Sequence, residues 1–248
     1  MIAATFRSDL FEGKVALVVG GTSGIGAAIG EAFAALGAVV TVTGATRAEA
    51  DAVRARPNIR CRDAVALDVR DADAISALMT ALPRLDFLVN CAGIIRRGAE
   101  HDGDAFADVV DVNLNGAMRC CTAARGRLVA TEGAIVNTAS MLAFFGGAHA
   151  PAYSASKGGV AQLTKSLAIA YANDGIRVNA VAPGWVRTPL TQPLVDDAAR
   201  SAAIVARTPL GRWAEPADVA GAVVFLCSPA AQFVTGVVLP VDGGYLAM

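Results

Sequence analysis

The chain has 248 residues, of which 54% are apolar and 17% are charged, and its formal net charge is −1. This composition is typical of a globular protein with a large core and excludes a disordered chain or an acidic tail. The charge balance gives no indication of nucleic acid or an anionic membrane as a partner.

The apolar runs are far shorter than the stretch of about 20 residues that a membrane-spanning helix needs. The first residues lack the basic-then-apolar pattern of a signal peptide, so we expect a cytoplasmic protein. The five cysteines are odd in number and show no Cys-x-x-Cys spacing, which predicts reduced thiols without disulfides or zinc. His101 and His149 show no ligand spacing, so no metal site is predicted.

Apolar runs alternate with helix-favouring segments along the chain. The runs predicted as buried strands are Lys14–Gly20, Ala38–Thr43, Ala64–Leu67, Leu85–Val89, Ala134–Asn137, Ile176–Ala182 and Val237–Val241. The first two predicted helices are Ala27–Leu36, which ends at Gly37, and Arg47–Arg56, which ends at Pro57; each later strand also follows a helical segment of ten residues or more.

This alternation predicts a single α/β domain over residues 1–248, a Rossmann-like, doubly wound sheet of seven parallel strands with helices on both faces. The one long departure is Thr188–Pro209, where three prolines bracket a polar helical stretch. We interpret residues 188–209 as a substrate lid, because insertions beyond a strand's carboxyl end often cover a binding site. A merely structural excursion is the alternative.

A glycine-rich turn, Gly20–Gly26, follows the first predicted strand and leads into a helix. In such a turn Gly20 permits the sharp bend, Gly24 lets the backbone approach a pyrophosphate, and Gly26 lets the helix pack against the strand. Thr22, Ser23 and Ile25 lie between these glycines. The turn predicts a dinucleotide site.

The second predicted strand bears on the choice of cofactor. A dinucleotide site usually places an acid here for the adenosine ribose, but this chain has Gly44-Ala45-Thr46 with Arg47 beyond. Arg47 either pairs with the 2′-phosphate of NADP or is a solvated residue of the first helical turn. The cofactor is therefore NAD(P), with a slight preference for NADP.

Tyr153 and Lys157 stand four residues apart, so they share one face of a helix. A nearby ammonium group favours the phenolate and lowers a tyrosine pKa. The pair is therefore suited to proton transfer near neutral pH.

In this order, the motifs resemble those of the short-chain dehydrogenases/reductases over essentially the whole chain, although Val19 stands where a threonine is usual and Cys91 where an asparagine is usual. The resemblance implies hydride transfer between NAD(P) and a secondary alcohol or ketone, without a metal. The residues implied in cofactor binding, besides the glycine-rich turn, are Asp68, Val69, Asn90, Ala92, Gly93, Tyr153, Lys157, Pro183, Gly184, Val186 and Thr188.

The resemblance also implies four catalytic residues. Tyr153 exchanges a proton with the substrate oxygen, Lys157 tunes it, and Ser140 orients that oxygen. Asn113 anchors a water that leads to the lysine. A catalytically silent nucleotide-binding sensor is the alternative of another class, but it predicts the loss of such residues, and all are present.

Three segments resemble dehydrogenases of keto-deoxy-gluconate and related sugar acids: residues 93–97, 140–147 and 207–213. Arg96 and Arg97 are expected to hold a substrate carboxylate, the alternatives being a solvated pair or a subunit contact. The expected pocket wall is apolar and favours a 3-oxoacyl thioester or a hydrophobic ketone instead. It comprises Met141, Leu142, Phe144, Phe145 and Trp185. A sugar acid is slightly preferred.

The family's matching helices pack between subunits, so residues 106–130 and 151–172 predict a homotetramer. The apolar C-terminal segment, residues 243–248, is either part of an interface or an ordinary core tail.

Overall fold

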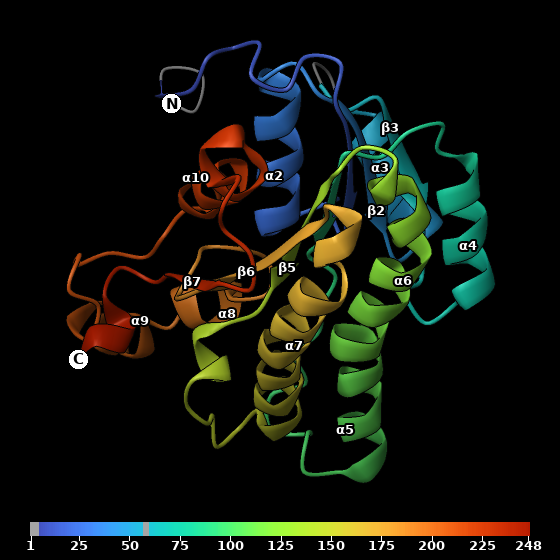
Figure 1. Ribbon diagram of the computed structural model, residues 1–248. Coiled ribbons are helices and arrows are strands. Elements are labelled where there is room, and N and C mark those ends of the chain that lie inside the picture. Colours follow the sequence, from blue (N-terminus) through green and yellow to red (C-terminus); the bar gives the residue numbers. More distant parts are fainter. Residues whose placement is uncertain (1–4, 57–59) are drawn as a thin grey trace.

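Seven parallel strands form one sheet in the order β3-β2-β1-β4-β5-β6-β7 (Figure 1). The computed structural model describes residues 5–56 and 60–248. The strands are β1 (Val15–Val19), β2 (Val39–Gly44), β3 (Asp63–Ala66), β4 (Phe87–Asn90), β5 (Ala134–Thr138), β6 (Arg177–Pro183) and β7 (Val238–Val241). Each of the seven predicted strands is present, with no end displaced by more than two residues. The Rossmann-like, doubly wound fold is thereby confirmed.

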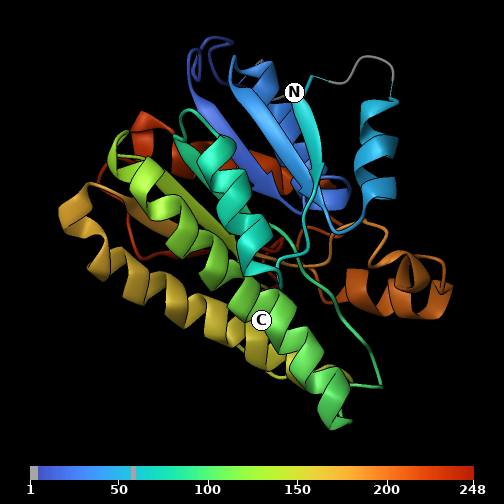
Figure 2. The ribbon, with the colours of Figure 1, turned by 90° about the vertical axis from the view of Figure 1, so that its right-hand side faces the viewer.

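Helices cover both faces of the sheet. They are α2 (Gly24–Ala35), α3 (Arg47–Arg54), α4 (Ala72–Ala81), α5 (Gly103–Val110), α6 (Gly116–Val129), α7 (Pro151–Ala170), α8 (Gln192–Val195), α9 (Ala198–Ala206) and α10 (Pro216–Cys227). Helices α2, α3 and α10 pack on one face, and α4, α6 and α7 pack on the other. Figure 2 shows α7 beside the long helical column of α5 and α6.

One helix prediction needs correction. α3 has eight residues and ends at Arg54, so its expected length of ten is wrong; its expected stop at Pro57 lies outside the described residues. Within residues 106–130, a π-helical turn at Asp111–Asn115 joins α5 to α6. Such turns are rare and frequently occur at functional sites.

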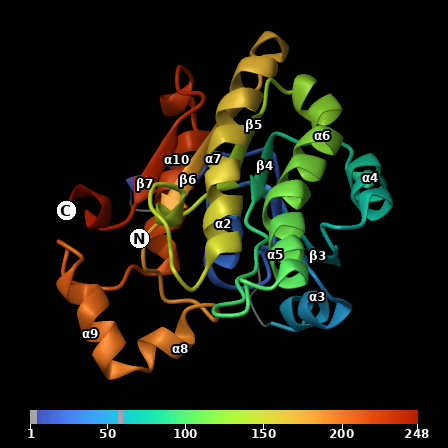
Figure 3. The same ribbon diagram turned by 90° about the horizontal axis from the view of Figure 1, so that it is seen from below.

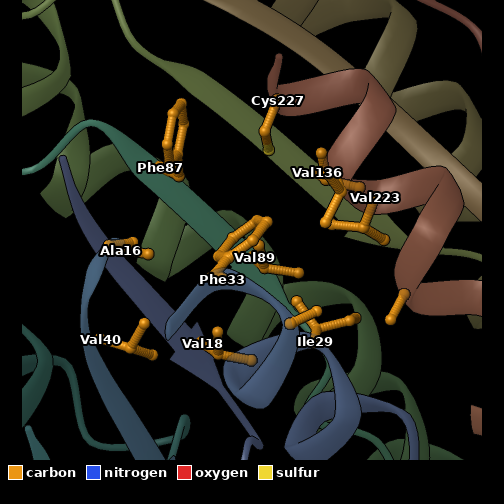
Figure 4. Packing of buried hydrophobic residues seen from close by; sticks show 14 of the residues in the cluster. Ala16, Val18, Ile29, Phe33, Val40, Phe87, Val89, Val136, Val223 and Cys227 are labelled. Atoms are coloured by element: carbon orange, nitrogen blue, oxygen red, sulfur yellow. The ribbon is translucent and has the colours of Figure 1, made fainter. Parts of the chain in front are cut away.

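The core on the α2 and α10 face is built around three phenylalanines, of which Figure 4 shows Phe33 and Phe87. Phe33 of α2 and Phe87 of β4 have ring centroids 5.7 Å apart, and Phe11 lies 5.2 Å from the first and 4.9 Å from the second. Rings at these separations and tilts interact favourably in addition to the area they bury. The core therefore ties α2 and β4 together and holds the glycine-rich turn between them.

Because all strands are parallel, their carboxyl ends meet at one edge of the sheet. From β1 the chain adds β2 and β3 on one side of the sheet, and it then adds β4 to β7 on the other side of β1. The direction in which strands are added therefore reverses between β1 and β4. Folds of this type bind ligands in the crevice at such a switch point. Figure 3 shows α8 and α9 together at a margin of the molecule away from α4 and α6. None of the helices in residues 5–56 and 60–248 is long and apolar enough to cross a membrane.

Candidate active site

The glycine-rich turn has no space for side chains at its key positions. Gly20 has a φ of +77°, and a Cβ there would lie 2.6 Å from the Ala92 Cα after β4. Gly24 has a φ of +53°, and a Cβ on Gly26 would collide with the Gly20 carbonyl oxygen. The backbone thus comes so close to the loop after β4 that only glycine fits at position 20.

The start of α2 suits a phosphate group. Ser23 occupies the N-cap, but its side chain makes no capping hydrogen bond, and the first turn contains no acid. The amide groups at this end are therefore not neutralised by a carboxylate of the first turn, and the helix dipole favours an anion there. These residues fit a dinucleotide pyrophosphate.

Thr43 of β2 compensates for the valine at position 19. Its hydroxyl accepts a hydrogen bond of 3.2 Å from the Gly20 N–H, and its carbonyl accepts one of 2.8 Å from the Gly21 N–H. The turn is therefore ordered from the adjacent strand.

A carboxylate does lie at the end of β2, so the expectation that this corner has none is wrong. Thr46 and Glu49 form a capping box, which folds the Glu49 side chain back against Gly44. Arg56, at the far end of α3, donates a 3.2 Å hydrogen bond to the Thr22 carbonyl and brings a second guanidinium to this corner. Arg47 has no ion-pair partner among the described residues.

Asp68 and Val69 follow β3, as expected for the adenine side. The Asp68 carboxylate is bound by Arg70 at 2.7 Å, which lowers its pKa. Val69 packs so closely on Gly116 that a Cβ at this glycine would lie 2.6 Å from the valine side chain.

Asn90 at the end of β4 belongs to a buried polar network. Its amide donates 2.9 Å to Asn137 of β5, whose own amide donates 3.0 Å to Thr164 of α7. The network fastens α7 to the centre of the sheet. Cys91, next in the chain, places its sulfur 3.2 Å from the Thr138 hydroxyl.

The π-helical turn directs Asn113 into the space beneath the β4 loop. Its amide accepts from the Ile94 N–H at 2.8 Å and donates to the Ile94 carbonyl at 3.0 Å and to Ser156 at 3.1 Å. A Cβ on Gly93 would lie 3.3 Å from the Asn113 side-chain oxygen and 3.6 Å from the Lys157 ammonium. The predicted residues Gly93, Asn113 and Lys157 are thus brought together.

Tyr153 and Lys157 lie on one face of α7, as the spacing predicts. The ammonium of Lys157 is 5.5 Å from the Tyr153 ring centroid and donates a 2.6 Å hydrogen bond to the Thr138 carbonyl. Ser140, just beyond β5, lies close enough to the Tyr153 side chain to lower its pKa. Three of the predicted catalytic side chains therefore meet at the carboxyl edge of the sheet.

The electrostatics of this pair differ from the sequence expectation. Burial raises the pKa of Tyr153, and Glu100 raises it further, although Ser140 and Arg97 act in the opposite direction. Burial also lowers the pKa of Lys157 to about 8. The expected net lowering of the tyrosine pKa is therefore wrong for this structure, because desolvation outweighs the favourable charges.

The loop after β6 closes over the glycine-rich turn. Gly184 approaches the chain so closely that a Cβ would lie 2.7 Å from the Asp242 Cα, and Val186 is buried beside Ala214. The Thr188 methyl is 3.3 Å from the place of a Cβ on Gly24. The segment from Pro183 to Thr188 thus packs against the glycine-rich turn at Gly24.

The two adjacent arginines have different surroundings. Arg96 donates a 2.9 Å hydrogen bond to Asp108 of α5, which also pairs with Arg70. Arg97 has no hydrogen-bond or ion-pair partner among the described residues and lies 6.0 Å from the Trp185 ring centroid. The expectation that both arginines are available to one carboxylate is wrong, because Asp108 engages the first.

The apolar wall is only partly assembled as expected. Phe145 stacks on Tyr245 with centroids 6.1 Å apart, and Trp185 meets Trp213 edge-on at 5.8 Å. Met141 is buried and Leu142 is half-buried just after Ser140. Phe144 is 53% exposed, so its expected place in the wall is not supported.

Sequence reasoning missed Glu100, which is buried in the loop after β4 and accepts hydrogen bonds of 2.8 Å from the backbone N–H groups of Arg96 and Tyr153. The sequence signal for such a residue was the start of α7, where Ala150 precedes Pro151 and provides no capping side chain. A helix without its own cap needs an acceptor from another segment. Within residues 5–56 and 60–248, no three His, Cys, Asp or Glu side chains gather into a potential metal site.

Comparison with known proteins gives matches along nearly the whole chain. A family model described as enoyl-(acyl carrier protein) reductase matches residues 19–246. The 2-dehydro-3-deoxy-D-gluconate 5-dehydrogenase of Pseudoalteromonas atlantica is 42% identical over 95% of this chain and 96% of its own. The cis-4-hydroxycyclohexanecarboxylate dehydrogenase of Sinomonas cyclohexanicum is 43% identical over 97% of this chain and 99% of its own.

A solved structure agrees with these relatives. It is a provisionally named 2-deoxy-D-gluconate 3-dehydrogenase from Agrobacterium tumefaciens with bound NADP. It is 41% identical, has a TM-score of 0.88, and covers 98% of this chain and all of its own. With the nucleotide turn and the serine, tyrosine and lysine at one sheet edge, these matches show that the chain belongs to the short-chain dehydrogenase/reductase family of oxidoreductases.

Proposed function

We propose that this oxidoreductase transfers hydride between NADP(H) and the carbinol carbon of a secondary alcohol that carries a carboxylate, with a sugar acid of the gluconate or keto-deoxy-gluconate type as the substrate. The observation that carries the proposal is the unpaired guanidinium of Arg97 beside Trp185 and Tyr153. The names of the relatives support the same class of substrate.

Arg97 is suited to a substrate carboxylate because its guanidinium forms no hydrogen bond or ion pair with the described residues. Burial lowers its pKa, while the negative charge of Glu100 raises it. A guanidinium that is partly removed from water and unpaired gains from a bidentate carboxylate partner. The buried indole N–H of Trp185 also has no acceptor in the described residues, and a substrate hydroxyl is a suitable partner for it.

The catalytic roles follow from the arrangement around α7. The Tyr153 hydroxyl donates a proton to the substrate oxygen in reduction and accepts one in oxidation. The Ser140 hydroxyl orients that oxygen, and Lys157 stabilises the negative charge that develops on the phenol. Asn113 holds the loop at Ile94 through two hydrogen bonds, and its proposed role is to anchor a water that leads to Lys157.

Bound NADP supplies the hydride acceptor for oxidation, and NADPH the donor for reduction. Residues 20–26, 68–69, 90–93 and 183–188 would hold it, and Arg47 and Arg56 would favour its 2′-phosphate. Glu49 opposes that phosphate, so we infer only a modest preference for NADP over NAD.

The segment 188–209 acts as a lid over this site. Its α9 brings Arg200 near enough to Arg97 to lower the arginine's pKa. At the end of the segment, Arg207 stacks over Tyr245 at 4.3 Å and lies 5.6 Å from the Phe145 ring centroid. The lid is thereby linked to the C-terminal turn and to the loop after β5.

The protein assembles as a homotetramer in this proposal. Phe106 and Met118 are partly exposed beside α7, whose Ile169 is 80% exposed, and Phe233 is exposed near the C-terminal strand. Such apolar surface favours contact between subunits. Light scattering that finds only monomer contradicts this part.

The apolar wall favours a second candidate, an alicyclic hydroxy acid. A ring with few hydroxyl groups suits an apolar wall that includes Phe145 and Trp185, while Arg97 would hold its carboxylate, and one relative is named for such a substrate. An acyl thioester or a hydrophobic ketone suits the wall but leaves the guanidinium unpaired.

Steady-state kinetics with NADP⁺ and NADPH over hexonates, keto-deoxy-hexonates, hydroxycyclohexanecarboxylates, acyl thioesters and neutral ketones test the proposal. We expect turnover of carboxylate substrates. In Arg97→Ala their KM rises about tenfold to a hundredfold, since a charge-assisted hydrogen bond contributes about 1.5–3 kcal/mol. Arg96→Ala is the matched control, with a smaller change. Turnover confined to thioesters or neutral ketones contradicts the proposal.

A further inference from the structure

Glu100 is a buried carboxylate without a cationic partner. It is 1% exposed, and no ion pair forms to it within the described residues. Its two oxygens each accept a backbone hydrogen bond of 2.8 Å, from Arg96 and from Tyr153. Burying a charge is costly unless the fold gives it hydrogen-bond partners, and here both partners lie beside the residues proposed to bind and protonate substrate.

The bond to Tyr153 supplies a cap that α7 lacks. Ala150 at the N-cap has no side-chain acceptor, and Pro151 has no N–H. Tyr153 therefore presents one of the first free amide groups of the helix, and Glu100 accepts it from another segment of the chain. A negative charge at this end is also favoured by the helix dipole.

The bond to Arg96 fixes the backbone next to Arg97. One side chain thus holds the position of the cation through the loop and the position of the phenol through the helix. Other contacts hold the same loop against the segment before α7. The Gly98 N–H donates 2.8 Å to the His149 carbonyl, and His101 Nε2 lies 3.0 Å from the Ala148 carbonyl.

We propose that Glu100 is a positioning residue of the active site that sets Tyr153 against Arg97, and so aligns the carbonyl of a carboxylate substrate with the proton donor. The alignment with Arg97 rests on the proposed function, whereas the placement of Tyr153 does not. A shift of about 1 Å in a catalytic group costs on the order of a hundredfold in rate, so a geometric role of this kind has a measurable effect.

The negative charge of Glu100 has a second effect, on the pKa of Tyr153, which can be separated from its effect on position. Tyr153 is faced by Glu100 and Arg97 from the β4 loop, by Ser140 from the end of β5, and by Lys157 on its own helix. Of these, Glu100 is the group whose negative charge raises the tyrosine pKa. Removing that charge therefore lowers the pH at which Tyr153 becomes a phenolate.

Glu100→Gln and Glu100→Asp separate the two effects. Glutamine keeps the length but removes the charge and turns a donor toward one of the two amides. Aspartate keeps the charge but is one methylene too short for both. We expect kcat to fall about tenfold to a hundredfold in both variants, with NADPH affinity unchanged. Only Glu100→Gln should shift the pH midpoint of alcohol oxidation downward.

Asp102→Asn is the matched control, because Asp102 lies in the same loop and caps α5 by accepting two hydrogen bonds of 3.0 Å from Asp104 and Ala105. Asp102→Asn should leave kcat and the pH midpoint of alcohol oxidation unchanged. The tyrosinate absorbance of Tyr153, isolated by subtracting Tyr153→Phe, gives its midpoint without any substrate. This absorbance measurement tests the placement of Glu100 beside Tyr153 even if the enzyme turns over no carboxylate substrate. A Glu100→Gln enzyme with wild-type kcat and midpoint, or an equal effect of Asp102→Asn, overturns the proposal.

Discussion

The ammonium group of Lys157 donates a 2.6 Å hydrogen bond to the backbone carbonyl of Thr138, at the end of β5. This bond ties the lysine to the sheet edge, and the lysine is only 4% exposed. Lys157 thus lies near the predicted nucleotide and substrate residues, but its ammonium group is removed from water. This burial disfavours the charged form of the lysine.

The stability of the protein should depend on pH through Lys157. Its pKa is about 8 in the fold against 10.5 for the free side chain, so between these values the unfolded chain binds more protons and folding becomes more favourable as pH rises. Relative to Lys157→Met, the wild-type free energy of unfolding should increase by about 3 kcal/mol from pH 7.5 to 10.5, at about 1.36 kcal/mol per pKa unit.

Urea unfolding of both proteins across this pH range measures the difference. Tyr153, whose raised pKa weakens stability only above its ordinary value near 10, is common to both and largely cancels. Lys165→Met, at an exposed lysine of the same helix, is the control and should give a flat difference. A flat difference for Lys157→Met as well means that the buried ammonium has no depressed pKa.

Tyr153→Phe should lose the proton donor and keep the fold. We expect kcat to fall about 10²- to 10⁴-fold, the range for removing a general acid, while NADPH binding measured by fluorescence stays near that of the wild type. Tyr171→Phe is the control, because Tyr171 stacks on Arg125 at 4.7 Å at the far end of α7. Near-normal turnover by Tyr153→Phe removes this residue from the mechanism.

Glu49→Gln should shift the cofactor preference toward NADPH. Glutamine preserves the capping box with Thr46 but removes the charge that opposes a 2′-phosphate. We expect the ratio of kcat/KM for NADPH to that for NADH to rise about tenfold, which corresponds to about 1.4 kcal/mol.

Asp51→Asn provides the comparison for that measurement, since Asp51 lies on the same helix and is paired with Arg54 at 2.9 Å. It should leave the ratio unchanged. A fall in the ratio for Glu49→Gln, or no change, means that the carboxylate does not face the adenosine ribose.

Much of the fold could be predicted because it depends on local patterns. Continuous apolar runs such as Val15–Val19 occur where a strand is buried on both faces, and their alternation with helices requires parallel pairing. The π-helical turn at Asn113 could not be predicted, because its hydrogen bonds to Ile94 and Ser156 come from residues 19 and 43 positions away.

The sequence by itself determined the family, the sheet, the nucleotide turn and the spacing that puts Tyr153 and Lys157 on one helical face, since all of these follow from order and periodicity along the chain. Only the tertiary structure decided which charges are free. Asp108 pairs with Arg96 and leaves Arg97 available, and burial raises the pKa of Tyr153. Pairing and desolvation depend on which distant segments meet in space, and local sequence patterns do not contain that information.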